Sequence, residues 1–375
     1  MLNVERLKNF FLELASIASP SRCEGAVAAY LEEKFSSLGA RCHFDNSSSK
    51  TGSEVGNLIV DLWPEKGPPL LFLAAHMDTV QPADNPKVIF ENGVFRSDGR
   101  TVLGADDKSA LAIFLELAHH LVEEKLFWPV QFVCTTCEEI GLLGAKHLDY
   151  SLLRAPFGYA LDSEDPHDLI NRAPEAIRFS IRVLGRAAHA GLNPEKGINA
   201  IRVAAEALVK IDLGRLDSET TANVGLIKGG QATNIVPEEV LLEGEIRSHS
   251  HEKLEACWEK ITKSFEKVAH QWQKPGDTRP RVSCTRHEDY PLMAVPEGHP
   301  VVQNAFKAGE ALGHLLRLTK TGGGSDANIF NARGFPCVIL GTGMRKVHST
   351  EEYLPLEDFV RACELTFELL RQAAG

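Results

Sequence analysis

Several acids and histidines in this sequence stand directly after short apolar runs or at the start of a helical pattern. They are His76, Asp78, Asp106, Asp107, Glu138, Glu139, Asp162 and His348. Taken singly, each has an ordinary explanation, such as a surface carboxylate, a hydrogen-bonded histidine or a helix cap. In an open α/β sheet, however, ligands bind outside the carboxyl ends of the strands. We therefore expect these side chains to converge at one edge of one sheet.

Imidazole and carboxylate groups together are suitable ligands for zinc or a similar divalent ion. Because carboxylates outnumber histidines here, the set favours two metal ions about 3.5–4 Å apart that share a bridging carboxylate. Such a pair lowers the pKa of bound water towards about 7 and polarises a carbonyl group. The reaction also needs a general base that is not a ligand, and the adjacent Glu138 and Glu139 can supply one base and one ligand.

The elements that must position these residues alternate between strands and helices. Continuous apolar runs predict strands buried on both faces at Leu70–Ala75, Val130–Cys137, Phe157–Asp162 and Cys337–Gly341. Helical spacing predicts helices at Lys108–Lys125 and Val301–Leu312, in a segment after Cys137, and from Leu356 to the end. This order predicts an α/β fold with a central, mostly parallel sheet and helices on both faces.

The pattern changes in the middle of the chain. Strand patterns at Ile177–Leu184, Thr221–Lys228, Val240–His249 and Arg281–His287 are interleaved with helical patterns at Asn199–Ile211 and His251–Trp272. The resulting β-α-β-β-α-β order is the ferredoxin-like arrangement, an α+β fold. We therefore predict a first part of the main domain at 1–174, an inserted domain at 175–288, and the second part of the main domain at 289–375.

The composition excludes several classes of protein. The chain has 375 residues and a formal charge of −11, with 51 acids against 40 Lys and Arg. This acidic balance argues against a nucleic-acid partner, which would require a basic surface. No run reaches the roughly 18 apolar residues of a membrane span, and the amphipathic N-terminus does not look like a signal peptide. With eight cysteines and no secretion signal, we expect free thiols and a cytoplasmic protein.

Eight short motifs occur in an order and spacing that resemble those of a known family. They are HMDTV (His76–Val80), GADDK (Gly104–Lys108), EEIGLLGA (Glu138–Ala145), LDS (Leu161–Ser163), AHAG (Ala188–Gly191), TNIVP (Thr233–Pro237), GGGSDAN (Gly322–Asn328) and HSTEEY (His348–Tyr353). The sequence resembles the co-catalytic zinc exopeptidases, which include peptidase T, glutamate carboxypeptidase and succinyl-diaminopimelate desuccinylase. GADDK and GGGSDAN make the peptidase T-like branch the most similar. The resemblance covers essentially the whole chain.

The resemblance implies two divalent metal ions, Zn²⁺ by preference, with Co²⁺ or Mn²⁺ as alternatives. One would be bound by His76, Asp106 and Asp162, and the other by the bridging Asp106 with Glu139 and His348. Glu138 would be the general base. Asp78 would orient the His76 imidazole from behind. A cis peptide bond between Asp106 and Asp107 is also expected.

The resemblance also implies that the inserted domain is a lid through which two copies form a homodimer. His189 would stabilise the tetrahedral oxyanion, often across the dimer. Arg247 would bind a substrate carboxylate through its planar fork. The substrate site would further include Asn234, Gly323, Gly324 and Ser325.

The leading hypothesis is thus a metal-dependent exopeptidase that hydrolyses short peptides, of the aminopeptidase or tripeptidase type. The alternative is an amidohydrolase or deacylase acting on N-acyl amino acids or related small amides, which the metal motifs alone do not separate from a peptidase. A third reading is an inactive peptide-binding module. Since no ligand and no base is missing from the motifs, this third reading is the weakest.

Overall fold

The computed structural model describes residues 2–272 and 279–375. Contacts along the chain divide it into two compact units. The main unit is formed by Met1–Ala173 together with Met293–Gly375, and the inserted unit by Pro174–Leu292. Each unit has its own cluster of buried apolar side chains.

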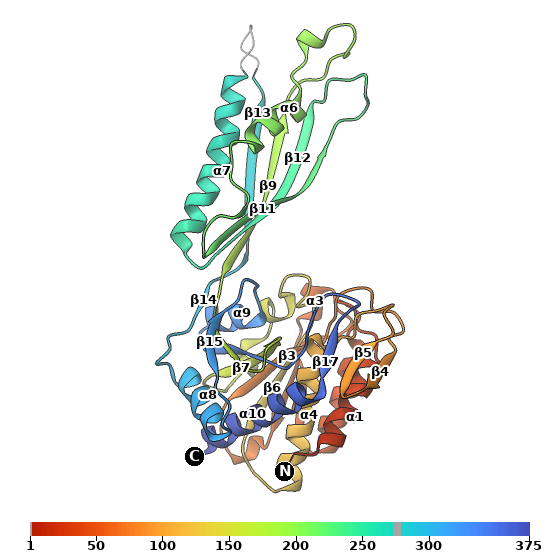
Figure 1. Cartoon of the computed structure of the whole chain (residues 1–375), viewed down its shortest axis with the longest axis vertical. Helices are drawn as coiled ribbons and strands as arrows, with labels where there is room; N and C mark the ends of the chain where they lie inside the picture. The colour runs from red at the N-terminus through yellow and green to blue at the C-terminus, as the bar shows by residue number, and fades with distance from the viewer. Residues whose placement is uncertain (1, 273–278) are drawn as a thin grey trace. The chain divides into compact units, whose positions relative to one another are not determined.

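A nine-stranded sheet forms the centre of the main unit (Figure 1). Its strands are β1 (Arg41–Phe44), β2 (Leu58–Leu62), β3 (Phe72–His76), β6 (Val130–Thr135), β7 (Gly158–Ser163), β8 (Asp168–Ala173), β14 (Met293–Ala294), β15 (Arg317–Lys320) and β16 (Cys337–Gly341). The order is β1-β2-β6-β3-β7-β16-β8-β14, with β15 paired to β8. The four central strands β6, β3, β7 and β16 are parallel, whereas the neighbours towards both edges are mostly antiparallel. The predicted fold class is confirmed.

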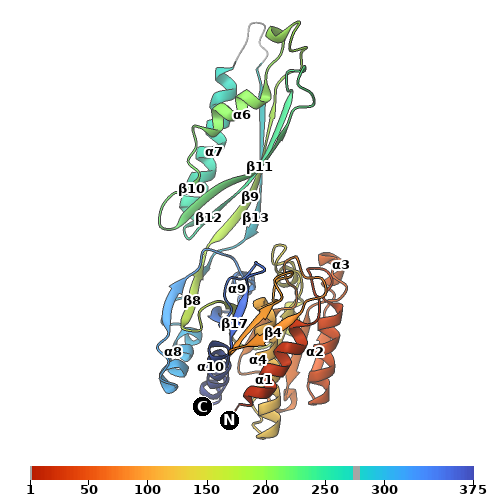
Figure 2. The same ribbon diagram turned by 45° about the vertical axis from the view of Figure 1, so that its right-hand side comes forward.

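Helices cover both faces of this sheet (Figure 2). The helices of the main unit are α1 (Val4–Ala15), α2 (Gly25–Ser37), α3 (Ser48–Thr51), α4 (Ala105–Glu123), α5 (Leu143–Lys146), α8 (Pro300–Ala311), α9 (Asp326–Ala332) and α10 (Leu356–Ala374). Short 3₁₀ turns lie at Pro64–Lys66 and Tyr150–Leu152, and β4 (Val88–Glu91), β5 (Val94–Ser97) and β17 (Tyr353–Pro355) form a small separate sheet. None of the helices among the described residues is long and apolar enough to cross a membrane.

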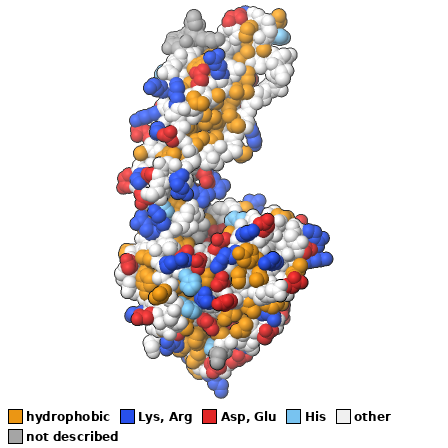
Figure 3. Space-filling view, in the orientation of Figure 1, with side chains coloured by type: hydrophobic (Ala, Val, Ile, Leu, Met, Phe, Trp, Pro, Cys, Tyr) orange, Lys and Arg blue, Asp and Glu red, His pale blue; other side chains and the backbone are white. Residues whose placement is uncertain are grey.

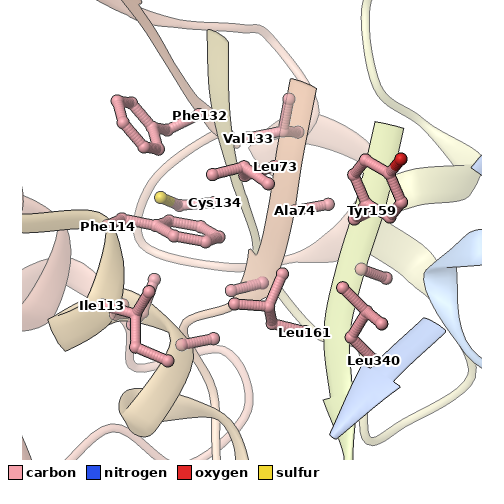
Figure 4. Close-up of a cluster of buried hydrophobic side chains, with 14 of the residues drawn as sticks. Leu73, Ala74, Ile113, Phe114, Phe132, Val133, Cys134, Tyr159, Leu161 and Leu340 are labelled. Carbon is pink, nitrogen blue, oxygen red and sulfur yellow. The ribbon is translucent and has the colours of Figure 1, made fainter. Parts of the chain in front are cut away.

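Aromatic contacts show how the strands divide their side chains between the two helix layers. Phe132 of β6 packs on Phe114 of α4, with ring centres 5.2 Å apart (Figure 4). Phe72 of β3 instead packs on Phe330 of α9, at 5.1 Å. Because Leu73, and not Phe72, is the partner of Phe132 in the sheet register, Phe72 points to the opposite face. The central strands are therefore buried on both sides, as their continuous apolar sequences predict.

Some predicted elements differ from the observed ones. The helical segment expected after Cys137 is limited to the single turn of α5, Leu143–Lys146. Strands β1, β2, β8 and β15 were not predicted. β15 is a four-residue edge strand with a charged residue at each end, Arg317 and Lys320, so its sequence lacks the apolar run that marks the central strands.

The inserted unit has the predicted β-α-β-β-α-β order. Its elements are β9 (Glu175–Leu184), α6 (Ala200–Leu208), β10 (Gly214–Arg215), β11 (Thr220–Gly229), β12 (Glu239–Ser248), α7 (His251–Gln271) and β13 (Arg281–Tyr290), with a 3₁₀ turn at Pro194–Lys196. The sheet is antiparallel, in the order β10-β11-β12-β9-β13, and α6 and α7 pack on it. Apart from the extra short strand β10, this is the strand order of a ferredoxin-like sheet.

Candidate metal centre

The acids and histidines singled out in the main unit meet at the carboxyl ends of its parallel strands. His76 is the last residue of β3, Asp162 is near the end of β7, and Glu138 and Glu139 follow β6 by three and four residues. Asp162, Glu138 and Glu139 border a cavity of about 220 Å³. Its lining includes Asp106, Glu138, Glu139, Asp162, Gly324, Ser325 and His348.

Asp106 lies between the two histidines. Its Oδ1 is 3.0 Å from Nε2 of His76, and its Oδ2 is 3.2 Å from Nε2 of His348. The same His348 nitrogen is 3.0 Å from Oε2 of Glu139. A carboxylate that offers one oxygen to each of two imidazoles has the arrangement that a bridging metal ligand needs.

Local backbone geometry sets this position. Asp106 and Asp107 stand at the start of α4 but have non-helical dihedral angles, so the regular helix begins only with Lys108, where the sequence predicts it. The peptide bond between the two acids is cis, as expected. The two side chains are therefore not arranged as successive residues of a helix.

The donor set fits metal ions for a second reason. Ligand atoms of His76, Asp106 and Glu139 lie within 4.8 Å of one another, and so do those of His76, Asp107 and Asp162. Among the described residues, Oδ1 of Asp107 and Oε1 of Glu139 are buried without a hydrogen-bond partner. Buried carboxylate oxygens need a compensating donor or cation, and a divalent ion bound by Glu139 would satisfy this need for its Oε1.

Burial and mutual repulsion shift the acid–base properties of the cluster. Burial raises the pKa of Glu138 well above its usual range, and neighbouring Asp162 and Glu139 add to this rise. Burial, followed by the charge of Asp106, raises the pKa of Asp162 to about 7. Hydrogen bonds to Asp106 and Glu139 raise the pKa of His348 to about 10. In the absence of metal, the cluster therefore retains protons that a metal ion would displace.

Asp78 has more contacts than the sequence predicts. The imidazole Nδ1 of His76 is 2.9 Å from the backbone carbonyl oxygen of Asp78 and 3.5 Å from its carboxylate. The carboxylate accepts hydrogen bonds from the backbone N–H groups of Glu138 and Glu139, at 2.9 and 3.2 Å, and from the hydroxyl of Ser21 at 2.6 Å. Asp78 thus orients His76 chiefly through its backbone, and its side chain holds the loop of the two glutamates.

Two residues near the centre were not singled out in the sequence. Glu352 is buried, and its carboxylate accepts the N–H groups of Gly104 at 2.8 Å and Asp106 at 3.0 Å. Lys108 is also buried and donates to the carbonyl oxygen of Ile17, and burial lowers its pKa to about 7. Glu352 lies inside the motif HSTEEY and Lys108 inside GADDK. Their place in these motifs was the sequence feature that could have indicated a role near the centre.

The predicted glycine loop lies before α9. Gly324 and Ser325 line the cavity, and the Ser325 hydroxyl also caps the helix by accepting the N–H of Ala327. Gly323, one residue earlier, donates its N–H to the Thr321 hydroxyl at 3.2 Å. The loop is therefore anchored at both ends.

The other predicted substrate residues belong to the inserted unit. His189 and Asn234 lie on neighbouring segments, since the carbonyl oxygen of Asn234 accepts the N–H of Ala190 at 2.9 Å and His189 pairs with Ile235. Arg247 lies on β12, where its guanidinium makes a two-pronged pair with Glu245, at 3.0 and 3.1 Å. Within this unit, the described contacts bring His189 and Asn234 together, but not Arg247.

Comparisons with known proteins agree with this geometry. A family model described as a peptidase dimerisation domain matches residues 174–273, and one for peptidase family M28 matches residues 57–205. The crystal structure of the aminopeptidase PepT from Bacillus cereus is 37% identical, with a TM-score of 0.91 and full coverage of both chains. The chain belongs to the peptidase T-like branch of the M20 peptidase family.

Two further relatives are similar over the same length. A tripeptidase from Staphylococcus aureus has a TM-score of 0.94 at 38% identity, again with full coverage of both chains. The uncharacterised protein YqjE of Bacillus subtilis is 40% identical over 376 residues, the full length of both sequences. The family resemblance drawn from the eight motifs is confirmed.

Proposed function

We propose that this chain is a metal-dependent exopeptidase that removes the N-terminal residue of short peptides, tripeptides among them. The observation that carries the proposal is the placement of Asp106 between His76 and His348, next to the paired Glu138 and Glu139. Membership of the peptidase T-like family supports it, and so do the related B. cereus aminopeptidase and S. aureus tripeptidase.

We infer that His76, Asp106 and Asp162 would hold one metal ion, and that Asp106, Glu139 and His348 would hold the other. Zn²⁺ is the proposed metal, with Co²⁺ and Mn²⁺ as alternatives, since histidine with carboxylate suits all three. When bound, such ions supply an acidified water and polarise the scissile carbonyl.

Glu138 has the properties of a general base. It lies in the loop after β6, directly before the proposed ligand Glu139. Its side chain borders the cavity and is not one of the proposed ligands. Its raised pKa makes it a better proton acceptor than an ordinary surface carboxylate once it is ionised. Glu138 would take a proton from the attacking water and return it to the leaving amine.

The charge of the cavity does not by itself choose between substrates. Among the described residues that line it, the charged side chains are acids and His348, and there is no Lys or Arg. Three of these acids, Asp106, Glu139 and Asp162, are proposed ligands, and two divalent ions would neutralise them. The preference for an aminopeptidase over a deacylase of N-acyl amino acids therefore rests on the related B. cereus aminopeptidase and S. aureus tripeptidase.

Substrate comparison tests this choice. A free tripeptide, its N-acetylated form and N-acetyl amino acids are incubated with the Zn²⁺-loaded enzyme, and the products are identified by mass spectrometry. We expect loss of the first residue from the free tripeptide only. Hydrolysis of the acetylated compounds at a similar rate would support the amidohydrolase alternative, and an absence of turnover together with an absence of stoichiometric metal would support a binding module.

Glu138→Gln tests the mechanism. The variant keeps the size of the side chain but removes the base, so kcat should fall by about 10²–10⁴-fold, with metal content unchanged by elemental analysis. The matched control is Glu351→Gln, an exposed residue paired with Lys346, which should retain full activity. Near-normal turnover of Glu138→Gln would contradict the assignment.

We also propose a cytoplasmic homodimer formed through the inserted unit. All eight cysteines are free thiols, which supports a reducing compartment.

The proposed dimer surface is the free edge of β11. On the side of β11 away from β12, β10 pairs only with Thr221 and Ala222. Beyond this, Leu226 and Ile227 are exposed (52% and 56%), and Figure 3 shows apolar side chains gathered on the viewed face of the unit. Such an edge is suited to pairing with a second copy.

Light scattering tests the dimer. Leu226→Lys places a charge at the proposed interface and should convert the dimer to a monomer.

In the dimer we propose that His189 stabilises the oxyanion, with Asn234 and Arg247 contacting substrate. His189→Ala should then lower kcat by about 10²–10³-fold without changing metal content. A monomeric wild-type enzyme with full activity would refute the role of His189 across the dimer.

A further inference from the structure

Three consecutive backbone N–H groups in the loop after β6 point at two buried carboxylates. Those of Glu138 and Glu139 donate to Asp78, as described above. The preceding N–H, that of Cys137, donates to Oε1 of Glu24 at 2.9 Å. The loop that carries the proposed base is therefore held from outside by two acids, and Glu24 belongs to a segment with no assigned role.

Both carboxylate oxygens of Glu24 have partners in the folded chain. Its side chain is fully buried, and Oε1 also accepts the N–H of Arg22 at 3.0 Å and lies 3.3 Å from the Cys137 thiol. Oε2 accepts the hydroxyl of Ser53 at 2.6 Å. Both carboxylate oxygens thus have donors, as a buried charge requires.

The position of Glu24 in its own helix makes these contacts unexpected. Glu24 is the residue before the first turn of α2, where an acidic side chain ordinarily accepts a helix N–H. Here it makes no capping hydrogen bond. The side chain is directed instead to Cys137, more than a hundred positions away in the sequence.

Cys137 needs an external contact of this kind. Its φ angle is +54°, in the left-handed region that residues with a β-carbon seldom adopt. The Cys137 N–H belongs to the peptide group before Cys137, and the Glu138 N–H belongs to the peptide group after it. Glu24 fixes the first and Asp78 fixes the second. Together they limit the backbone angles of Cys137 and so the direction in which the Glu138 side chain leaves the backbone.

The same segment also contacts the loop after β3. The Ser19 hydroxyl donates to the carbonyl oxygen of Met77 at 2.8 Å, and the Ser21 hydroxyl donates to the Asp78 carboxylate at 2.6 Å. Residues 19–24 thus connect the loop of His76 and Asp78 with the loop of Glu138 and Glu139.

We propose that Glu24 is a positioning residue for the peptidase reaction: it holds Cys137 and thereby aims Glu138 at the substrate. The inference rests on the proposed function. Its test therefore combines turnover with a measurement of backbone order that does not depend on turnover.

The test compares Glu24→Ala and Glu24→Gln in the full chain loaded with Zn²⁺. In Glu24→Ala, kcat for a tripeptide should fall about 10- to 100-fold, because small displacements of a catalytic group have effects of this size. KM should remain within about twofold, since no substrate contact is removed. Amide hydrogen exchange in the peptide covering residues 137–139 should accelerate. Glu24→Gln keeps an acceptor for the Cys137 N–H and should recover most of kcat.

Glu54→Ala is the matched control. Glu54 is exposed and accepts the N–H of Gly25, the next residue of the same segment, so its loss should leave kcat and exchange unchanged. If Glu24→Ala lowers only the thermal midpoint, while kcat and exchange at 137–139 stay at wild-type values, Glu24 is a stability residue and the proposal is wrong.

If Glu24→Ala does not fold, Glu24→Asp replaces it. This variant keeps the charge but is one methylene too short to reach Cys137, and it should show the same fall in kcat. A wild-type kcat would overturn the proposal. If the wild-type protein hydrolyses no peptide, the proposed function fails, whereas the exchange measurement still decides whether Glu24 orders the loop.

Discussion

At the scale of single residues, the candidate centre is a set of charges that compensate one another while no metal is bound. Asp106 accepts from both histidines, and His348 also pairs with Glu139. These contacts raise the pKa of His348 to about 10, and burial raises that of Asp162 to about 7. Metal ions need the deprotonated forms of these same groups.

Metal binding should therefore release protons. At pH 7, His348 of the metal-free protein is protonated, because its pKa lies above that pH, and Asp162 is about half protonated. The pKa of His76 is likewise raised by its pairing with Asp106, so this ligand must also lose a proton. Calorimetric titration of the metal-free protein with Zn²⁺, in buffers of different ionisation enthalpy, should show about two to three protons released. Apparent affinity should rise with pH until about 10. A proton count of zero at pH 7 would contradict the described pairing.

A second residue-scale prediction concerns Glu352, whose carboxylate accepts the N–H groups of Gly104 and Asp106. Its removal should free the backbone of Asp106, the proposed bridging acid. We expect Glu352→Ala to weaken Zn²⁺ binding about 10- to 100-fold, as is usual for groups that orient metal ligands. Competition with a chromogenic chelator would measure this. The exposed neighbour Glu351 is the control, and an equal loss in Glu351→Ala would argue against a specific role for Glu352.

At the scale of elements, α1 and α4 are joined by a partly buried ion pair. Glu116 of α4 is fully buried and accepts from Nε and Nη2 of Arg6, at 2.6 and 3.1 Å, and from the backbone N–H of Asn3. Since α4 also carries Asp106 at its start, this contact fixes the helix that presents the proposed bridging acid.

Removing Arg6 from this ion pair should lower the stability of the folded chain. Arg6→Ala leaves the Glu116 carboxylate buried with less compensation, so the free energy of unfolding should fall by about 3 kcal/mol. Urea denaturation followed by circular dichroism measures the change. Adding Glu116→Gln removes the uncompensated charge and should restore part of the loss. If Arg6→Ala with Glu116→Gln is less stable than Arg6→Ala alone, the Glu116 carboxylate is stabilised by groups other than Arg6.

Much of the fold and of the candidate centre could be predicted from the sequence, for a physical reason. Strands buried on both faces are continuous apolar runs, so Val130–Cys137 is visible as a strand and the acids after it as sheet-edge residues. Glu24 and Glu352 were not predicted, because an acid before a helix or in a loop ordinarily faces water. Their partners, Cys137 and Asp106, are distant in sequence, and only the folded chain brings them together.

At the scale of the whole molecule, the two units have separate cores. The inserted unit buries its own apolar side chains between its sheet and α6 and α7, among them Phe179, Ile181 and Phe265. The main unit is continuous across the insertion, because Met293 of β14 pairs with Ala173 of β8.

The inserted unit should therefore fold alone. A chain of residues 174–292 should show mixed α/β circular dichroism and a cooperative thermal transition, since its core and sheet are complete. The remaining residues, with a short linker between Ala173 and Met293, should still bind Zn²⁺. Absence of a cooperative transition in the 174–292 chain would show that its stability depends on the main unit.

The insertion between β8 and β14 also delays the synthesis of the last residues of the proposed metal centre. His76, Asp106, Glu139 and Asp162 emerge early, whereas β16 and His348 emerge only after the whole inserted unit. Glu352, which accepts the backbone N–H of Asp106, also emerges after the inserted unit. A nascent chain thus could not complete the proposed metal centre until translation is nearly finished. An enzyme that degrades peptides would in this way remain inactive until its own synthesis is almost complete.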